Sequence, residues 1–429
     1  MDFPFGGLYT VRNEAVKTRR KRGPVMPSFE DARRTILESV PRLGAERVDL
    51  LSAAGRVAAE DTTAPWDMPF YDNSAMDGFA VRAADCRPGI ALPVTSYVPA
   101  GETGDAGVAP GCAVRIMTGA PIPSGCDTVI PIEDTEERPE GVLPREKVVP
   151  RQHVRFRGED IRKGEKIVSA GTVLRPPEIG MLASFGKAYT SVHRRARVAV
   201  LSTGDELIEL GEPPARGRII NSNAFSLAAS LREIGAESLI LGIARDDRES
   251  HLEKMAEGLG ADALITSAGV SAGDRDLVRG CLAELGVKQL FWRVDIKPGG
   301  PFAFGMREGT PVFSLPGNPV STMITFEELV RPALLRMMGR RRVIRPLVKA
   351  TLRGAARKKP GKIHFFRVQV EEEDGRYWAI SSGDQNTGIL GTMVRANGIA
   401  VLPKDRVEFA AGEEVSVHLL HDDFGMAEE

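Results

Sequence analysis

The sequence predicts a multidomain protein of α/β and β parts: a parallel α/β domain, a β domain inserted into an α-rich linker, and a small C-terminal β-barrel. Three observations support this prediction. Short apolar runs alternate with helical periods from about Arg197 to Gly339, which is typical of βα units. Residues 65–150 are rich in Gly, Pro, Val and Ile. Turn residues separate alternating apolar runs in residues 341–429, which favours a barrel, or else a sandwich.

The N-terminal part is expected to hold a tail and a split linker. Arg19-Arg20-Lys21-Arg22 is a basic cluster in residues 1–27, which we expect to be a disordered, solvated tail rather than a nucleic-acid patch. Helical patterns run from Ser28 towards Val40 and from Pro177 to Ser184, on either side of the β insert. Together they predict one linker domain in two segments, residues 28–64 and 151–193.

The α/β domain is predicted to span residues 194–340 and to bind a ligand. Its strands run into loops of small polar residues, such as Ser202 to Glu206 and Ser267 to Asp274. In parallel sheets, ligands bind beyond the carboxyl ends of the strands. The sequence therefore predicts a ligand site at this edge of the sheet.

The turn Pro316-Gly317-Asn318-Pro319 is the most informative of these loops. It follows the strand-like run Val312 to Leu315 and opens a helix at Val320. Two prolines make the turn rigid, and the amides of a helix N-terminus are left free, which suits an oxyanion. Taken alone, the turn could also be a purely structural connection.

Composition and motifs exclude several classes of function. Lys and Arg number 57 against 58 acids, so no net field attracts nucleic acid. No G-x-G-x-x-G follows a strand, and Gly180 to Lys187 lacks the spacing of a phosphate-binding P-loop. Four scattered cysteines predict neither a zinc site nor disulfides. No apolar run reaches membrane-spanning length or forms a signal core, so we expect a soluble, cytoplasmic protein without membrane partners.

Two acidic motifs lie in and just after the β insert. Asp72 to Gly78 holds two acids among small polar residues, and Arg155 to Asp160 holds two arginines and two acids. Acids would repel an oxyanion unless a divalent cation lies between them, held by carboxylates and holding phosphate oxygens. The alternative is that the first motif only caps a turn and that Arg157 pairs with Glu159 at the surface.

Seven motifs, in order along the chain, resemble one family: the MoeA and gephyrin E-domain family of molybdopterin molybdenumtransferases. The resemblance spans about Ser28 to the C-terminus and leaves only the basic tail outside. It implies a linker domain, an inserted β domain, a molybdopterin-binding α/β domain and a C-terminal barrel. The motifs are DNSAMDG (Asp72 to Gly78), RIMTGAP (Arg115 to Pro121), RGEDI (Arg157 to Ile161), STGDEL (Ser202 to Leu207), SAGVSAG (Ser267 to Gly273), IKPG (Ile296 to Gly299) and LPGNPVS (Leu315 to Ser321).

The resemblance implies Mg²⁺-dependent insertion of molybdate into adenylylated molybdopterin, with release of AMP. Asp77 and Asp160 would hold Mg²⁺ and orient the anhydride, and Glu206 would join them. Lys297 would complete the catalytic set by contacting anionic oxygens. Substrate contacts are implied for Thr118, Arg155, Ser202, Thr203, Gly204, Asn223, Gly269, Ser271, Asp276, Pro316, Gly317, Asn318 and Pro319.

The resemblance also implies how the chain assembles. In the family, the acids of the β insert face the α/β pocket of the other subunit, so a homodimer would be needed for activity. Other cofactor-biosynthesis or molybdoenzyme-maturation proteins are further candidate partners.

The chain departs from the family pattern at two positions. Ala268 replaces the first glycine of a GGVS motif, and Gly300 stands where the family has a second lysine. We expect either a lost cation at Gly300, replaced by Arg293 or Arg155, or a glycine kept for a positive φ. The alternatives left open are a tungstate-handling or low-activity paralogue, a non-catalytic pterin-binding scaffold, and an adenylyltransferase. The last class lacks the insert and the barrel.

Overall fold

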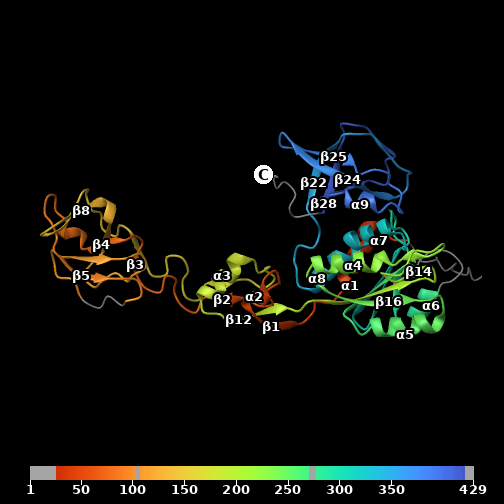
Figure 1. The fold of residues 1–429 in the computed structure, drawn as a ribbon, viewed down its shortest axis with the longest axis horizontal. Helices are drawn as coiled ribbons and strands as arrows, with labels where there is room; N and C mark the ends of the chain where they lie inside the picture. Colours follow the sequence, from red (N-terminus) through yellow and green to blue (C-terminus); the bar gives the residue numbers. More distant parts are fainter. Residues whose placement is uncertain (1–25, 103–106, 270–276, 421–429) are drawn as a thin grey trace, which may run out of the picture. The chain divides into compact units, whose positions relative to one another are not determined.

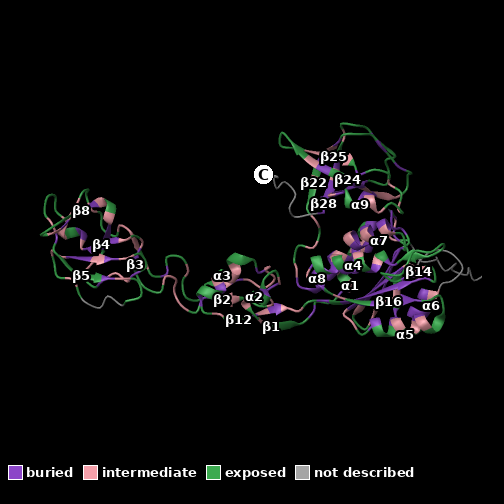
Figure 2. Cartoon of the chain, viewed as in Figure 1, coloured by how far each residue is buried: buried purple, intermediate pink, exposed green. Residues whose placement is uncertain are grey.

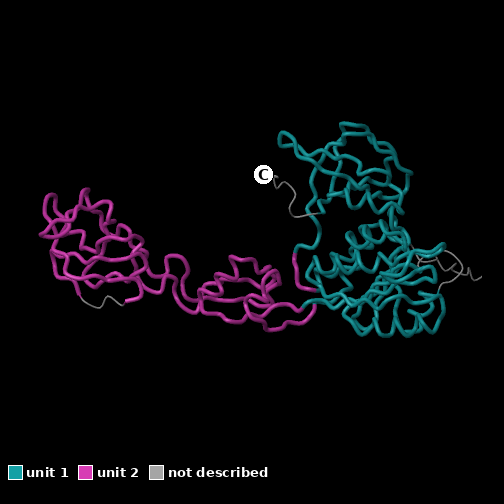
Figure 3. The backbone as a smooth tube through the Cα atoms, viewed as in Figure 1, with its two compact units in different colours: residues 1–42, 195–337, 342–429 teal, residues 43–194, 338–341 magenta. Residues whose placement is uncertain are grey.

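The computed structural model describes residues 26–102, 107–269 and 277–420, which divide into two compact units (Figures 1 and 3). Unit 1 contains residues 1–42, 195–337 and 342–429, and unit 2 contains residues 43–194 and 338–341. The basic cluster at residues 19–22 lies outside the described residues. So do Ser271 and Asp276.

Unit 2 contains a four-stranded sheet in the order β5-β6-β4-β7 and a separate hairpin of β8 and β9. Its central strand β4 is buried on both faces, because successive residues of a strand point to opposite sides. Phe79 and Val81 belong to one apolar cluster, and Ala80 belongs to another. The strands are β4 (Gly78–Val81), β5 (Val94–Val98), β6 (Ala113–Ile116), β7 (Thr128–Pro131), β8 (Thr135–Arg138) and β9 (Gly141–Pro144).

In the rest of unit 2, segments that precede this sheet in the sequence pair with segments that follow it. Three antiparallel pairs form: β1 with β12, β2 with β11, and β3 with β10. Leu174, Leu182 and Val192 are fully buried in the core between these strands and two helices. The elements are β1 (Ala45–Asp49), α2 (Leu50–Ala53), β2 (Thr62–Thr63), β3 (Asn73–Ser74), β10 (Val154–Arg155), β11 (Lys166–Val168), α3 (Pro176–Ser184) and β12 (Tyr189–His193).

Unit 1 contains a six-stranded sheet in the order β16-β13-β17-β21-β20-β18. The first four strands are parallel, β20 runs antiparallel to them, and β18 is antiparallel to β20 and so points the same way as the first four. The inner strands β13 and β17 read as apolar runs and are buried, because both of their faces are covered (Figure 2). Their bounds are β13 (Arg197–Thr203), β16 (Glu237–Ala244), β17 (Ala263–Ser267), β18 (Lys288–Phe291), β20 (Ala303–Arg307) and β21 (Thr310–Leu315).

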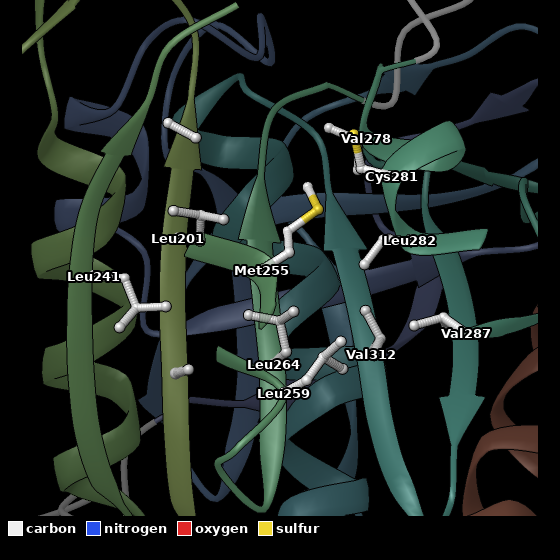
Figure 4. Close-up of a cluster of buried hydrophobic side chains, with 12 residues drawn as sticks. Leu201, Leu241, Met255, Leu259, Leu264, Val278, Cys281, Leu282, Val287 and Val312 are labelled. Atoms are coloured by element: carbon white, nitrogen blue, oxygen red, sulfur yellow. The ribbon is translucent and has the colours of Figure 1, made fainter. Parts of the chain in front are cut away.

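Helices cover the two faces of this sheet (Figure 1). α5 and α6 pack Met255 and Leu282 against Leu264 of the central strand in one fully apolar cluster (Figure 4). No helix among the described residues is long and apolar enough to cross a membrane. The helices are α4 (Ser222–Glu233), α5 (Arg248–Gly258), α6 (Leu277–Glu284), α7 (Pro319–Thr325) and α8 (Arg331–Met337), with a π-helical turn, η3 (Phe326–Val330), between the last two.

Helix α1 (Phe29–Ser39) belongs to unit 1, although the sequence assigns residues 28–64 to the linker domain. Its apolar stripe of Phe29, Ala32 and Ile36 is buried, and the Phe29 ring packs 5.0 Å from that of Phe365. The amphipathic pattern predicts the helix correctly, but it does not say which core the apolar face covers.

The C-terminal part of unit 1 is a closed five-stranded barrel, which confirms the predicted barrel and, with the parallel α/β sheet, the fold class. β24 pairs with both β25 and β26, and β22 and β28 complete the ring. β19 (Ile296–Lys297), from the α/β part, adds to β24 and sets Lys297 beside His364. The barrel strands are β22 (Leu347–Leu352), β24 (Ile363–Glu373), β25 (Arg376–Ser381), β26 (Gly398–Leu402) and β28 (Glu414–Leu419), with α9 (Gly391–Val394) between β25 and β26.

Candidate functional site

A cavity of about 500 Å³ opens at the carboxyl ends of β13, β17 and β21, where the sequence predicts a ligand. Of the predicted residues described in unit 1, most line it: Ser202, Glu206, Asn223, Gly269, Pro316, Gly317, Asn318 and Pro319. Thr203 and Gly204 are not among the lining residues. A Cβ at Gly204 would collide with the Glu206 carboxylate, so this glycine makes room for the acid.

Two asparagines at the N-terminus of α4 give this strand-end pocket its polar wall: Asn221, which caps the helix, and Asn223 in its first turn. The Asn223 amide donates to Ser267 Oγ at 3.0 Å and to the Gly317 carbonyl at 2.8 Å, which ties two loops together. Ser202 Oγ donates to Asn221 Oδ1 at 2.7 Å. Asn221 Nδ2 and Asn223 Oδ1 are buried without a partner among the described residues. Buried polar groups are nearly always hydrogen-bonded. The donor Asn221 Nδ2 and the acceptor Asn223 Oδ1 are therefore candidates for hydrogen bonds to a ligand.

The Pro316 to Pro319 turn leads into helix α7 as predicted, but one amide at the N-terminus of this helix is already hydrogen-bonded within the protein. The N–H of Val320 donates to the Thr387 carbonyl of the barrel at 3.3 Å. The turn therefore contributes shape and contact to the pocket, and fewer free donors than the sequence suggests. Asn221 and Ser267 were missed by the sequence reasoning, although Ser267 begins one of the polar loops that it singled out.

A second cavity, of about 600 Å³, lies where β19 joins the barrel. Lys297 is the predicted residue in it; apart from the neighbouring Pro298, the others come from the barrel and its loops. This cationic pocket is lined by Lys297, Pro298, Arg357, Lys358, Lys359, His364, Phe365, Phe366, Arg367, Gln385, Asn386 and Thr387.

Arg367 is the most unusual residue of the cationic pocket, because it is fully buried with no carboxylate bonded to it. Its Nε donates to Thr392 Oγ1 at 2.8 Å and its Nη2 to the Asp384 carbonyl at 3.0 Å. Its Nη1 has no partner among the described residues. A buried cation without a counter-ion is costly, so an anion is the natural ligand. An arginine within the mostly apolar run 363–370, where both faces of the strand are largely buried, was the signal that sequence reasoning passed over.

His364 remains neutral in this pocket. Burial, together with the nearby ammonium groups of Lys297, Lys358 and Lys362, lowers the pKa of His364 to about 4. The three lysines thus act on one imidazole, and at neutral pH this ring can both donate and accept a hydrogen bond.

The acids predicted to hold Mg²⁺ are spread over the two units. In unit 2, Asp77 Oδ1 accepts from the N–H of Thr118 at 2.6 Å and from its Oγ1 at 2.7 Å, so the structure joins two predicted site residues. The bonds from Thr118 lower the pKa of Asp77, which keeps its carboxylate ionised. Asp160 and Arg155 are exposed.

The loop that carries Asp160 is tied to the first acidic motif. The N–H of Arg157 donates to Asp72 Oδ1 at 2.7 Å, and Arg157 Nε donates to Asp67 Oδ2 at the same distance. Glu159 instead accepts from the N–H of Phe156. The expected surface pair of Arg157 with Glu159 is therefore wrong, because Asp67 offers the guanidinium a partner that the local sequence does not reveal.

The described acids fit a cation only in part. Mg²⁺ is commonly held by one or two carboxylates, waters and substrate phosphates. Asp77, Asp160 and Glu206 offer that donor chemistry, yet no group of three or more His, Cys, Asp or Glu is gathered as a metal site within residues 26–102, 107–269 and 277–420. A cation would need phosphate oxygens of the substrate to complete its ligands.

Three family models match successive parts of the chain. Residues 27–186 match the MoeA N-terminal region (domain I and II), residues 199–336 match a model described as "Probable molybdopterin binding domain", and residues 349–420 match the MoeA C-terminal region (domain IV).

Individual relatives match nearly the whole chain. Molybdopterin molybdenumtransferase from Haemophilus influenzae is 37% identical and covers 92% of this chain and 100% of its own. Molybdopterin molybdenumtransferase 2 from Mycobacterium tuberculosis is 36% identical, with 91% and 99% covered. The crystal structure of the molybdopterin biosynthesis MoeA protein from Pyrococcus horikoshii superposes with a TM-score of 0.81 at 31% identity and covers 92% and 100%.

Proposed function

Since this chain belongs to the MoeA family of molybdopterin molybdenumtransferases, we propose that it transfers molybdenum from molybdate to molybdopterin in cofactor biosynthesis. One observation supports the proposal: unit 1 contains a cationic pocket, in which one nitrogen of a buried guanidinium, Arg367 Nη1, lacks a partner among the described residues, and a separate polar pocket at the strand ends. A tetrahedral oxyanion needs positive charge, which the cationic pocket offers, and a pterin nucleotide needs neutral hydrogen-bonding groups, which the strand-end pocket offers.

The strand-end pocket is the proposed site for the adenylylated pterin. A pterin ring carries hydrogen-bond donors and acceptors along its edge, and Asn221 Nδ2 and Asn223 Oδ1 offer one unpaired group of each kind. Gly269 and the Pro316 to Pro319 turn supply close backbone contact. A volume of about 500 Å³ lies within the range of small-molecule sites.

The cationic pocket is the proposed site for molybdate. Arg367 Nη1 is the buried donor that lacks an acceptor, and the exposed Lys297 ammonium adds a second positive charge. Charge-assisted bonds of this kind contribute about 1.5–3 kcal/mol each. Neutral His364 adds a donor without raising the charge further.

The carboxylates are proposed to serve the adenylate end of the substrate. When bound, Mg²⁺ would neutralise phosphate charge and polarise the anhydride that yields AMP. Asp77 and Asp160 would hold it, with Glu206 from the strand-end pocket. Thr118 holds the Asp77 carboxylate in one orientation through two bonds to Oδ1, which leaves Oδ2 as the oxygen for a cation.

Assembly and location are proposed from the family resemblance. We propose a cytoplasmic homodimer whose activity needs acids and pocket from different subunits. Proteins of cofactor biosynthesis or molybdoenzyme maturation are its candidate partners.

In vitro insertion with the purified protein, adenylylated molybdopterin and Mg²⁺ tests the proposal. We expect AMP release and a molybdenum-loaded pterin with molybdate. Turnover with tungstate alone would instead support a tungstate-handling paralogue. Tight pterin binding without AMP release from either oxyanion would favour the scaffold alternative and contradict the transferase.

A further inference from the structure

Gly300 is buried, and the space beside it is filled by a lysine from another part of the chain. The positive φ of this turn belongs to Gly299 (φ 92°), so the backbone does not force a glycine at position 300. A Cβ on Gly300 would lie 3.4 Å from Lys362 Nζ and 3.1 Å from the Ile296 carbonyl oxygen. The ammonium of Lys362 thus lies where a longer side chain at position 300 would begin.

The loop before β24 holds Lys362 in this place. The buried ammonium of Lys358 donates to the carbonyl of Lys362 at 3.1 Å and to that of Lys404 at 3.4 Å. The N–H of Gly361 also donates to the Lys404 carbonyl, at 3.0 Å. Directly after Lys362, Ile363 pairs with Ile296 of β19. The turn is therefore fixed on both sides, and the Lys362 side chain leaves from a rigid base.

Most of the cationic groups around Lys362 have no ion-pair partner among the described residues. Lys297 and Lys362 form no ion pair with any described residue, and both lower the pKa of the same pocket histidine. Lys358, Lys359 and Arg367 add further positive charge around the cavity, whereas Arg357 pairs with Glu408 at 3.2 Å. The other nearby acids are Asp384, which acts on Arg367, and Asp405, which acts on Lys358. Positive charge remains in excess, so an anion would complete the pocket.

We propose that Lys362 binds the oxyanion substrate together with Lys297, because its ammonium lies within contact distance of the place where a side chain at position 300 would begin; the tighter restriction on that side chain comes from the Ile296 carbonyl oxygen. This inference rests on the proposed molybdate site and adds a binding residue to it. The cation expected from the sequence at position 300, or from Arg293 or Arg155, is then supplied by the barrel, 62 residues further along the chain.

Isothermal titration of the full chain with molybdate tests this, using variants at both positions and Lys349→Ala as a control. Lys349 is an exposed barrel lysine paired with Glu414, so the control removes the same charge away from the pocket. We expect Lys362→Ala to weaken molybdate binding on the order of tenfold, Lys362→Arg to keep most of the affinity, and the control to bind like the wild type.

The reciprocal variants sharpen the test. Gly300→Lys alone should not tighten binding, because its side chain meets the Lys362 ammonium, whereas Gly300→Lys combined with Lys362→Ala should recover affinity lost in the single variant. Removing the Lys362 charge should also raise the pKa of His364 in an NMR titration. Melting curves identify any variant that fails to fold, and Lys362→Met then replaces the alanine.

The possible failures are distinct. Equal molybdate affinity in the wild type and in Lys362→Ala or Lys362→Met overturns the role of Lys362 alone. No molybdate binding by the wild type overturns the proposed oxyanion pocket, and this inference with it.

Discussion

The two pockets of unit 1 are built by different means. The strand-end pocket gathers loops that follow three parallel strands, and its unpaired groups are neutral amides. The cationic pocket is formed by a two-residue strand of the α/β part lying on a barrel strand, and its unpaired group is a guanidinium. Neutral donors and acceptors select by shape and hydrogen-bond pattern, whereas a buried cation selects for charge. The difference suggests that each pocket takes one of the two substrates.

The largest effect should come from a residue outside both pockets. Asp77→Asn removes a proposed Mg²⁺ ligand, and we expect AMP release to fall by roughly 100-fold or more, while molybdate and pterin binding to unit 1 stay within about twofold. The Thr118 bonds can still reach the amide oxygen, so the fold should persist, as circular dichroism would show. Normal turnover by this variant would remove the metal role, and Asp160→Asn provides an independent repeat.

Arg367→Gln should separate the pockets most clearly. Losing a buried charge-assisted donor should weaken molybdate binding by roughly 10- to 100-fold and leave adenylylated-pterin binding unchanged. Titration calorimetry with each ligand gives both numbers. The melting temperature should also fall, because Arg367 bonds Thr392 and the Asp384 carbonyl. If the variant weakens pterin binding as much as molybdate binding, the pockets do not divide the substrates.

Asn223→Ala is the matching change in the strand-end pocket. It removes an acceptor without a partner and the bonds that tie Ser267 and Gly317 together. We expect adenylylated pterin to bind about 3- to 10-fold more weakly, with molybdate binding unaffected. The reverse pattern, measured in the same two titrations, would interchange the proposed ligands of the two pockets.

Ala268→Gly should change stability more than binding. Ala268 holds a φ of 79° at the end of β17, a conformation that costs an L-residue free energy and that glycine adopts freely. We expect the glycine variant to raise the free energy of unfolding by about 1 kcal/mol, measured by urea denaturation. Gly317→Ala should have the opposite effect and lower the free energy of unfolding, since its Cβ would lie 3.1 Å from that of Ala268. A less stable Ala268→Gly protein would mean that Ala268 carries no relievable strain.

The smallest effect concerns pH. The pKa of His364 is about 4 in the folded chain, below its ordinary value of 6.5. Between these values the unfolded chain binds more protons, so the free energy of unfolding should fall as the pH drops from 6.5 towards 4. His364→Gln should flatten this part of the stability profile. A slope that is identical in the variant would show that His364 does not titrate as described.

The sequence predicts the strand-end pocket better than the cationic one, for a physical reason. Loops after parallel strands converge at one edge whatever their length, so Ser202, Gly269 and the Pro316 to Pro319 turn could be placed together from pattern alone. Arg367 could not, because its pocket depends on which barrel strand pairs with β19.

Two further misses have the same origin in long-range contacts. The charge beside Gly300 comes from Lys362, and the partner of Arg157 is Asp67, each from a segment that no local period connects to it. Helix α1 was likewise predicted as a helix, but its place in unit 1 depends on contacts such as that of Phe29 with Phe365, which no local pattern shows. Local pattern determines the type of element, while tertiary pairing decides which charges meet.

Crystals soaked with molybdate and measured at the molybdenum absorption edge test the central claim most directly. We expect an anomalous peak in the cationic pocket, within hydrogen-bonding distance of Arg367 Nη1 and beside Lys297. A peak confined to the strand-end pocket between Asn221 and Asn223, with the cationic pocket empty, would contradict it.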